Sequence, residues 1–426
     1  MIIEKRILDF EKLGFGMFVH FGIYSQLGTG EWAKQILGIP GEEYEPLAKT
    51  FCPDPQWAEK LVSTAKNAGC KYITLTTRHH DGYSLYDTQG LNDYDAPHSC
   101  GRDLVREFVD ACNTQGIIPF FYHTLIDWRE ESCPYTSETN PEWNREGNWE
   151  AYMDYLQKSV ELLCKNYGPI GGLWFDGMWA YWDNDWQEDK LYGMIRSYQP
   201  DAMIINNTGL SKLGQLGHIE LDSVTFERGK PQPLNMEGAP KYIASEMCEV
   251  FNSHWGYAAG DLNYKSPASL IETLVDCRRY GSNLLMNVGP MGNGLLRPID
   301  EAYLDLMGQW VVRHEEAIRA PRPTDIEVEN RPGDFILKEG SSYYLFCRGL
   351  PMIGNLNVQL ERAADFVRHF PLEATVRSAK WLDNGQEIPF SQEKGQVTLN
   401  AQPFSYGNHW VVRVAKLETS ESSREM

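Results

Sequence analysis

Short apolar runs alternate with longer amphipathic segments through the first three quarters of the chain. The run at residues 13–21 (LGFGMFVHF) is rich in aromatic and β-branched side chains and predicts a strand. Residues 55–68 (PQWAEKLVSTAKNA) place apolar side chains at helical spacing, and the glycine that follows predicts the end of a helix. Repetition of a strand followed by a helix predicts parallel strands joined by helical crossovers.

The same pattern recurs to residue 318. Further strands are expected at residues 71–77, 117–122, 170–176, 202–206, 223–227, 242–251 and 283–288, and further helices at 103–113, 149–166, 186–197, 266–279 and 299–318. Six to eight such units without a glycine-rich phosphate-binding fingerprint favour a closed barrel over an open doubly wound sheet. The sequence therefore predicts an α/β fold built on a (β/α)8-like TIM barrel.

The pattern changes after a proline-rich break at residues 320–324 (APRPT). Short alternating segments follow at residues 335–337, 343–347, 356–360, 374–382, 397–399 and 409–414. They predict a small C-terminal antiparallel β-sandwich. We expect a barrel domain at residues 1–320, a linker at 321–333, the sandwich at 334–416 and a disordered polar tail at 417–426.

Composition narrows the class of ligand. A chain of 426 residues with 42% hydrophobic content buries a large core. A formal net charge of -20 argues against a nucleic-acid partner, because such proteins neutralise phosphates with clustered Lys and Arg. No run approaches the roughly 20 apolar residues of a membrane helix. Because of the net charge we expect a neutral ligand or a small molecule. Nine cysteines without a Cys-x-x-Cys pair indicate reduced thiols and no zinc site, and we expect no cofactor.

The first twelve residues alternate charged with apolar side chains and lack the apolar core of a signal peptide. We therefore expect a cytoplasmic protein. A secreted protein whose leader had been removed would have the same pattern.

The strand at residues 170–176 ends on Asp176. Residues two apart on a strand share a face, so Trp174 and Asp176 point the same way. A carboxylate at the C-terminal end of a parallel strand is placed for chemistry, because the loops that form active sites gather there. The alternative is an aspartate that caps the next helix.

Polar clusters follow the other predicted strands. They comprise His20, the pair Glu31 and Trp32, the pair His79 and His80, and His123. In a metal site, histidines and carboxylates would bind an ion such as zinc, often with two ligands two residues apart on the first strand, where only His20 is present. In a sugar site, neutral imidazole, carboxylate and indole N–H groups form hydrogen bonds to ring hydroxyls. The Glu-Trp pair and Trp174 favour the sugar.

Several motifs together resemble glycoside hydrolase family 29, the α-L-fucosidases. They are FVHFG at residues 18–22, EW at 31–32, RHHDG at 78–82, residues 122–128, LWFDG at 173–177, residues 247–257 and NLLMNVGPMGNG at 283–294. The resemblance implies a retaining exo-glycosidase that removes terminal α-linked L-fucose by double displacement. It implies Asp176 as the nucleophile and no metal.

The resemblance also implies the residues that bind the sugar. His20, Glu31, Trp32, His79, His80 and Trp174 are expected to hold hydroxyls or flank the ring, and Trp255 to lie near the C5 methyl. His123, where some members of the family have a tyrosine, is a further substrate-binding candidate because of its place after the third strand. Fucose lacks the 6-hydroxyl, so a polar group at that wall would be left unpaired.

Two residues compete for the acid/base role that retaining hydrolysis requires. Glu227 ends a predicted strand and enters a loop, with Arg228 beside it to hold a carboxylate or hydroxyl. Glu246 lies inside an apolar segment and is expected to be a pocket-wall residue. We favour Glu227.

The expected substrate is a fucosylated oligosaccharide or glycoconjugate. Three alternatives remain at this point: a non-catalytic fucose-binding protein on the same fold, a hydrolase for a related sugar such as α-L-galactose, and a metal-dependent hydrolase. Linkage preference and oligomeric state are not indicated by the sequence.

Overall fold

A computed structural model describes residues 2–137, 140–207, 217–234, 236–237, 239–353 and 366–420. The chain forms two compact units, one of Met1–Lys265 with Asn283–Asp305 and one of Ser266–Ser282 with Leu306–Met426. Helix α10 and the second half of α11 thus group with the second unit, although the sequence places them before the expected boundary at residue 320.

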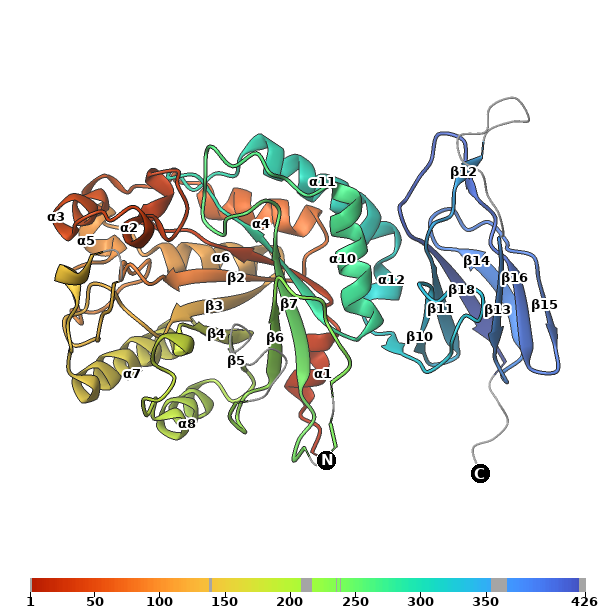
Figure 1. Ribbon diagram of the computed structural model, residues 1–426, viewed down its shortest axis with the longest axis horizontal. Coiled ribbons are helices and arrows are strands. Elements are labelled where there is room, and N and C mark those ends of the chain that lie inside the picture. The colour runs from red at the N-terminus through yellow and green to blue at the C-terminus, as the bar shows by residue number, and fades with distance from the viewer. Residues whose placement is uncertain are drawn as a thin grey trace. The chain divides into compact units, whose positions relative to one another are not determined.

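The first unit contains a closed parallel barrel in the order β1 to β8 (Figure 1). Its strands are β1 (Phe15–Val19), β2 (Tyr72–Arg78), β3 (Ile118–Thr124), β4 (Gly172–Asp176), β5 (Met203–Asn206), β6 (Ser223–Glu227), β7 (Ala244–Val250) and β8 (Asn283–Val288). Their burial is nearly continuous, as expected for parallel strands that are covered on both faces. The predicted TIM barrel is confirmed.

Helices α4 (Trp57–Asn67), α6 (Leu104–Gln115), α7 (Trp149–Asn166) and α8 (Glu188–Tyr198) lie outside these strands (Figure 1). Asp103 caps α6 by accepting from the Arg106 N–H, and Gly116 ends it with φ at 73°. The loops carry short helices: η1 (Ile23–Gln26), α2 (Ala33–Ile36), α3 (Gly41–Tyr44), η2 (Glu45–Thr50), α5 (Ala96–Cys100), η3 (Pro141–Trp143) and η4 (Met178–Tyr181).

Helix α1 (Lys5–Glu11) covers the N-terminal end of the barrel. The Phe10 ring lies 5.6 Å from that of Tyr72 and 5.9 Å from that of Phe120. The Phe10 carbonyl accepts from Asn283 Nδ2 at 2.7 Å, and Asn283 Oδ1 accepts from the Gly14 N–H at 3.1 Å. This end of the barrel is closed by packing and hydrogen bonds, which leaves the C-terminal ends of the strands for the site.

The barrel register aligns the side chains that point inward. Tyr122 on β3 pairs with Trp174 on β4, and Thr124 pairs with Asp176. The interior contains aromatic side chains from neighbouring strands, among them Phe18, Tyr72, Phe120, Tyr122 and Trp174. Asp176 is the next inward position above Trp174, at the open end of the barrel.

The second unit includes α10 (Pro267–Arg279), α12 (Glu315–Ile318), two antiparallel sheets and a short parallel pair of strands, β12 with β17. The expected helix at residues 299–318 is broken into α11 (Pro298–Arg313) and α12. The sheets contain β9 (Arg322–Pro323), β10 (Phe335–Glu339), β11 (Ser342–Cys347), β12 (Met352–Ile353), β13 (Val367–Pro371), β14 (Val376–Trp381), β15 (Phe390–Glu393), β16 (Gln396–Asn400), β17 (Phe404–Ser405) and β18 (Arg413–Thr419).

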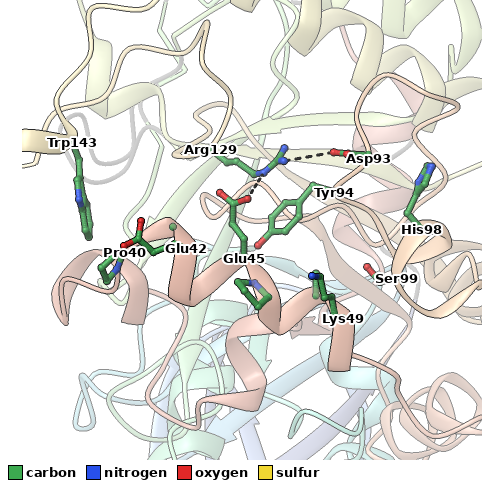
Figure 2. Close-up of a pocket in the computed structure, with 13 residues that line it drawn as sticks. Pro40, Glu42, Glu45, Lys49, Asp93, Tyr94, His98, Ser99, Arg129 and Trp143 are labelled. Carbon is green, nitrogen blue, oxygen red and sulfur yellow. Dashed lines mark ion pairs between the residues drawn. The ribbon is translucent and has the colours of Figure 1, made fainter.

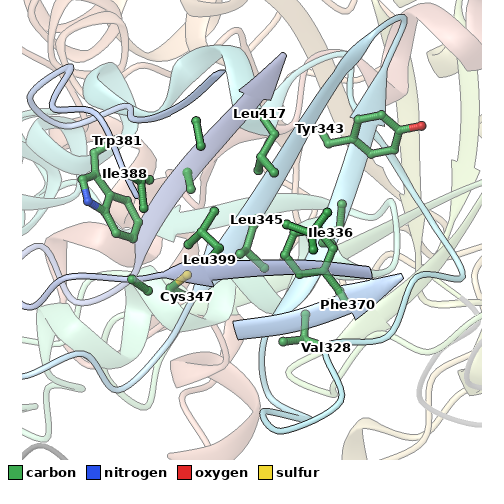
Figure 3. Close-up of a cluster of buried hydrophobic side chains, with 14 of the residues drawn as sticks. Val328, Ile336, Tyr343, Leu345, Cys347, Phe370, Trp381, Ile388, Leu399 and Leu417 are labelled. Carbon is green, nitrogen blue, oxygen red and sulfur yellow. The ribbon is translucent and has the colours of Figure 1, made fainter. Parts of the chain in front are cut away.

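The sheets enclose a core that includes Leu345, Phe370, Trp381 and Leu399 (Figure 3). The predicted β-sandwich is confirmed, with two differences in detail. Strand β9 lies inside the expected linker and pairs with β10, while β18 extends to Thr419, into the expected tail. The expected strand at 356–360 lies outside the described residues. No helix in the described ranges is long and apolar enough to cross a membrane.

Candidate active site

A cavity of about 120 Å³ lies at the C-terminal ends of the barrel strands. Eight of its lining residues were predicted from the sequence: His20, Trp32, His79, His80, Trp174, Asp176, Glu227 and Trp255. Five were not predicted: Phe18, Tyr122, Trp179, Asn207 and Cys248. Strand ends that are far apart in the sequence therefore bring the predicted catalytic pair into one small space.

Asp176 accepts hydrogen bonds from residues of three different elements. The Tyr122 hydroxyl donates to Oδ2 at 3.0 Å, and the Trp179 indole N–H donates to Oδ1 at 3.2 Å. Asn207 Nδ2 lies 3.3 Å from the same Oδ1. Donors on both oxygens fix the direction of the carboxylate, as attack on a fixed carbon requires.

Glu227 and Asp176 both contact the side-chain amide of Asn207. Asn207 Nδ2 is 2.7 Å from Glu227 Oε2 and 3.3 Å from Asp176 Oδ1. These two carboxyl oxygens are therefore at most about 6 Å apart, the sum of the two distances. Catalytic carboxyls lie roughly 5 to 5.5 Å apart in retaining glycosidases and roughly 6.5 to 9.5 Å apart in inverting ones. The upper limit of about 6 Å on the distance between the two oxygens fits a retaining glycosidase.

The two carboxyls differ in environment. Burial raises the pKa of Glu227 to about 7, and the charge of Asp176 acts in the same direction. The hydrogen bond from Asn207 and the charge of Arg228 oppose this rise in the pKa. Glu227 therefore keeps much of its proton near neutral pH, which suits a general acid.

His20 faces the cavity as a neutral imidazole, because burial lowers its pKa to about 3. Its Nδ1 lies 2.7 Å from Asn287 Oδ1, and the Asn287 amide nitrogen donates to the Trp255 carbonyl. The Asn287 oxygen must therefore accept, which assigns the proton of His20 to Nδ1. The other ring nitrogen, Nε2, is left as an acceptor.

His80 is neutral for the same reason, since burial lowers its pKa to about 4 against the opposing charge of Asp176. Its Nδ1 lies 2.6 Å from Thr124 Oγ1, and that hydroxyl donates onward to the Ile126 carbonyl. Nδ1 therefore carries the proton. The acceptor Nε2 lies 3.5 Å from Asp176 Oδ2, beside the predicted nucleophile.

His79 belongs to a stack of rings on one wall of the cavity. It lies parallel to Tyr122, with ring centres 5.6 Å apart and planes at 10°, and Tyr122 stacks on Trp174 at 5.8 Å. Burial lowers the pKa of His79 well below its usual range. The histidines of this wall thus present neutral polar groups, which suit hydroxyls better than a charged ligand.

Indole rings lie next to the histidines of the cavity, with Trp32 5.4 Å from the His80 ring. Trp32 and Trp179 are half-buried and stack with centres 5.9 Å apart, while the more buried Trp128 meets the edge of Trp32 at 5.0 Å. Trp255 lies 5.3 Å from the His20 ring. Flat apolar surfaces thus lie beside the hydrogen-bonding groups, the combination expected for a sugar.

Glu31 does not line the cavity. Its Oε2 accepts from the Gly256 N–H at 2.7 Å, next to Trp255. Burial raises the pKa of the Glu31 carboxyl. One oxygen of Glu31 thus supports the loop that carries Trp255, and the expected contact of Glu31 with a sugar hydroxyl stays a prediction.

Glu246 is also away from the cavity surface, contrary to the expectation of a pocket-wall residue. It is buried, and its oxygens accept from the Trp174 indole at 3.0 Å and from the Tyr72 hydroxyl. Burial raises its pKa to about 7, as for Glu227. The two carboxyls therefore differ in access and not in pKa.

His123 and Arg228 do not reach the cavity. Since Tyr122 points inward, its neighbour His123 points outward, where its Nδ1 lies 3.0 Å from Thr77 Oγ1. Arg228 is exposed, and its guanidinium donates to the Ser253 carbonyl at 3.4 Å. Neither position supports a direct contact with substrate.

One of the unpredicted lining residues, Phe18, had a signal in the sequence. Alternation places Tyr122 and His123 on opposite faces of β3, but only the register with Trp174 shows that Tyr122 faces inward. Phe18 lies two residues before His20 and shares its face. Asn207 and Trp179 had no such signal, because the loops that carry them set their directions.

A larger cavity lies elsewhere. It has a volume of about 760 Å³ and is bordered by α3, η2 and the loops after β2 and β3 (Figure 2). Arg129 forms ion pairs there with Glu45 at 3.3 Å and with Asp93 at 3.5 Å. This groove shares no residue with the site of Asp176 and Glu227.

Comparison with known proteins agrees with this geometry. The family model for alpha-L-fucosidase matches residues 5–316. The tissue alpha-L-fucosidase of Macaca fascicularis is 28% identical over 391 residues, which cover 82% of this chain and 77% of that protein. The alpha-L-fucosidase of Dictyostelium discoideum is 24% identical over 425 residues, covering 92% of this chain and 87% of that protein.

Solved structures give the same result. Alpha-L-fucosidase isoenzyme 1 from Paenibacillus thiaminolyticus has a TM-score of 0.81 at 28% identity and covers 98% of this chain and 99% of its own. A fucosidase from Bacteroides thetaiotaomicron, solved as a trapped covalent intermediate with 2-fluoro-fucosyl fluoride, has a TM-score of 0.79 at 21% identity, which shows the shared fold, and covers 98% and 96%. With a family model matched over most of its length, the chain belongs to the alpha-L-fucosidases of glycoside hydrolase family 29.

Proposed function

We propose that this protein is a retaining exo-α-L-fucosidase with Asp176 as nucleophile and Glu227 as acid/base. The observation that carries the proposal is the pair of carboxyls joined by one amide at a spacing that fits double displacement. The trapped covalent intermediate of the Bacteroides thetaiotaomicron enzyme supports the same mechanism in a protein of this fold.

In the first step Asp176 attacks the anomeric carbon as the glycosidic bond breaks. Glu227 donates its proton to the leaving oxygen, so the aglycone departs as a neutral alcohol. The hydrogen bonds from Tyr122 and Trp179 hold the nucleophile in place during the attack. The products are a fucosyl ester on Asp176 and an ionised Glu227.

In the second step Glu227 acts as a base. It removes a proton from a water molecule, which attacks the same carbon and releases Asp176 as a carboxylate. Configuration at the anomeric carbon is retained after two inversions. Glu227 is protonated again and the cycle is complete.

Recognition relies on neutral groups and aromatic faces. The acceptors Nε2 of His20 and of His80 suit sugar hydroxyls, and Trp255 suits the C5 methyl. A cavity of about 120 Å³ has room for a single terminal sugar, with the rest of the glycan outside. The substrate is then a fucosylated oligosaccharide or glycoconjugate cleaved at its end.

Replacing the nucleophile tests the proposal most directly. We expect Asp176→Asn to abolish turnover of an aryl α-L-fucoside, because an amide oxygen does not form the glycosyl ester. Release of the aryl alcohol measures the reaction. The matched control is Glu246→Gln, which makes the same chemical change at a buried carboxyl outside the cavity. Full activity in Asp176→Asn would refute the assignment.

Glu227 is tested by the dependence on leaving group. We expect Glu227→Gln to lower kcat/KM on natural fucosides by about 10²- to 10⁴-fold, and much less on substrates with acidic phenols, which depart without a proton. Azide should restore turnover in Glu227→Ala, because azide attacks the fucosyl ester without the help of a base. Rescue of a Glu246 variant instead would transfer the acid/base role to Glu246.

The raised pKa of Glu227 also predicts a pH-dependent stability. The folded protein holds this proton up to about pH 7, whereas the unfolded chain releases it near the ordinary pKa of 4.5, so the wild type loses stability between these values. We expect Glu227→Gln, which does not titrate, to gain on the order of 2 kcal/mol over the wild type as pH rises from 4.5 to 7. Urea unfolding at several pH values measures the difference, and an equal offset at every pH would contradict it.

Glu246 is expected to support the cavity floor. In Glu246→Gln the amide oxygen still accepts from Trp174 and its nitrogen donates to Tyr72, so activity should stay within about tenfold of the wild type. Glu246→Ala leaves both groups unpaired beside a new cavity, and we expect the free energy of unfolding to fall by about 2 to 4 kcal/mol. Denaturant unfolding followed by tryptophan fluorescence measures this loss. Unchanged stability in Glu246→Ala would argue against the floor role.

A further inference from the structure

Asn207 lies between the two carboxyls of the proposed mechanism. It follows the last residue of β5 and is almost fully buried. Its Nδ2 lies 2.7 Å from Glu227 Oε2 and 3.3 Å from Asp176 Oδ1. One amide nitrogen has two hydrogens, so it has one donor for each carboxyl.

The direction of this amide is fixed by its neighbours. The Thr225 hydroxyl donates to Asn207 Oδ1 at 3.0 Å, which turns the nitrogen toward the carboxyls. Thr225 lies two residues before Glu227 on β6 and shares its face. The backbone N–H of Asn207 donates to the Phe175 carbonyl at 2.7 Å, next to Asp176 on β4. The amide is thus held by both strands that carry the proposed catalytic residues.

The two bonds constrain where a proton resides. An amide N–H only donates, so Glu227 Oε2 and Asp176 Oδ1 both serve as acceptors. The proton of Glu227 is then favoured on its other oxygen, Oε1. Glu227 presents this oxygen as the donor for a leaving group.

The same two bonds serve both halves of the reaction. Before attack the negative charge lies on Asp176 and Glu227 is neutral. After the Asp176–carbon bond forms and the Oε1 proton moves to the glycosidic oxygen, Asp176 is a neutral ester and Glu227 is charged. A donor directed at each carboxyl stabilises the charge in either place, and hydrogen bonds to ionised groups are the stronger ones.

We propose that Asn207 is a positioning residue that holds the two carboxyls at their reactive spacing, directs the proton of Glu227 to Oε1, and stabilises the negative charge as it passes from Asp176 to Glu227. This inference rests on the proposed function, since it assumes the roles of Asp176 and Glu227. It assigns a role to a residue that touches neither the broken bond nor the proton that moves.

The pH profile of kcat/KM tests this role. Removing the amide removes a hydrogen bond that favours ionised Glu227. We expect Asn207→Ala to move the basic limb to higher pH by about one unit and to lower kcat on both activated and natural fucosides by about 10²-fold, since both steps lose a donor. A purely structural defect would lower activity without moving the limb.

The other titratable and charged groups near Glu227 remain present in this variant. They are Asp176 on β4, Tyr122 on β3, Cys248 on β7, Glu31 in the loop after β1 and Arg228 after β6. Because no charge is added or removed among them, a shift of the limb reports the loss of the amide and of its hydrogen bonds to the two carboxyls.

Thr225→Val provides a second variant that does not depend on the folding of Asn207→Ala. It keeps both amide hydrogens but removes the hydroxyl that directs them, so we expect a shift in the same direction of less than one unit. A limb that stays in place or moves down in Thr225→Val would overturn the inference. Asn206→Ala is a matched control, because it makes the same change at a neighbouring amide that donates to the Tyr192 hydroxyl at 3.1 Å, away from the carboxyls.

Glu227→Ala separates failure of this inference from failure of the proposed function. If Glu227→Ala keeps the basic limb, the acid/base assignment itself is wrong. If Glu227→Ala loses the limb while Asn207→Ala keeps it at the wild-type pH, only the role of Asn207 is refuted.

Discussion

Two carboxyls confined to one small, largely buried space are the constraint on which the rest of this site depends. Charges so close and so poorly solvated are not stable together, so one group must hold a proton. Asp176 accepts hydrogen bonds on both oxygens, whereas Glu227 accepts on one oxygen and has its pKa raised by burial and by Asp176. This difference in environment supports the proposed division of the nucleophile and acid roles between two chemically similar side chains.

The rest of the cavity avoids further charge. His20, His79 and His80 are neutral because they are buried, and each adjoins an aromatic ring. Below them, Glu246 holds the Trp174 indole from inside the barrel. A protein with a formal net charge of -20 thus keeps a site matched to an uncharged polyol. The charge of the surface says little about the chemistry inside.

The sequence predicts the barrel and its catalytic strand because both depend on local patterns. Strand alternation places Trp174 beside Asp176, and the structure agrees with that shared face. Alternation also places Tyr122 and His123 on opposite faces of β3, but it does not indicate which face points inward. The register with Trp174, which shows that Tyr122 faces the cavity, is set by the pairing of β3 with β4.

Other features depend on closure of the fold and have no local signal. Asn207 contacts both carboxyls only because β4, β5 and β6 are neighbours in the barrel. Glu31 carries a motif that suggests a sugar ligand, yet its oxygen is taken by the Gly256 backbone, far away in the sequence. Residues at 208–216, which follow Asn207, lie outside the described part of the chain.

The helix that closes the barrel at its N-terminal end is synthesised before the residues of the barrel that it contacts. Its polar contacts with the barrel lie far along the chain: Arg6 pairs with Asp222, Glu11 accepts from Tyr242, and the Phe10 carbonyl accepts from Asn283. Strand β1 likewise needs β8 as its second neighbour. These contacts are therefore complete only after nearly three hundred residues of synthesis. Until then the segment is open to chaperones and proteases.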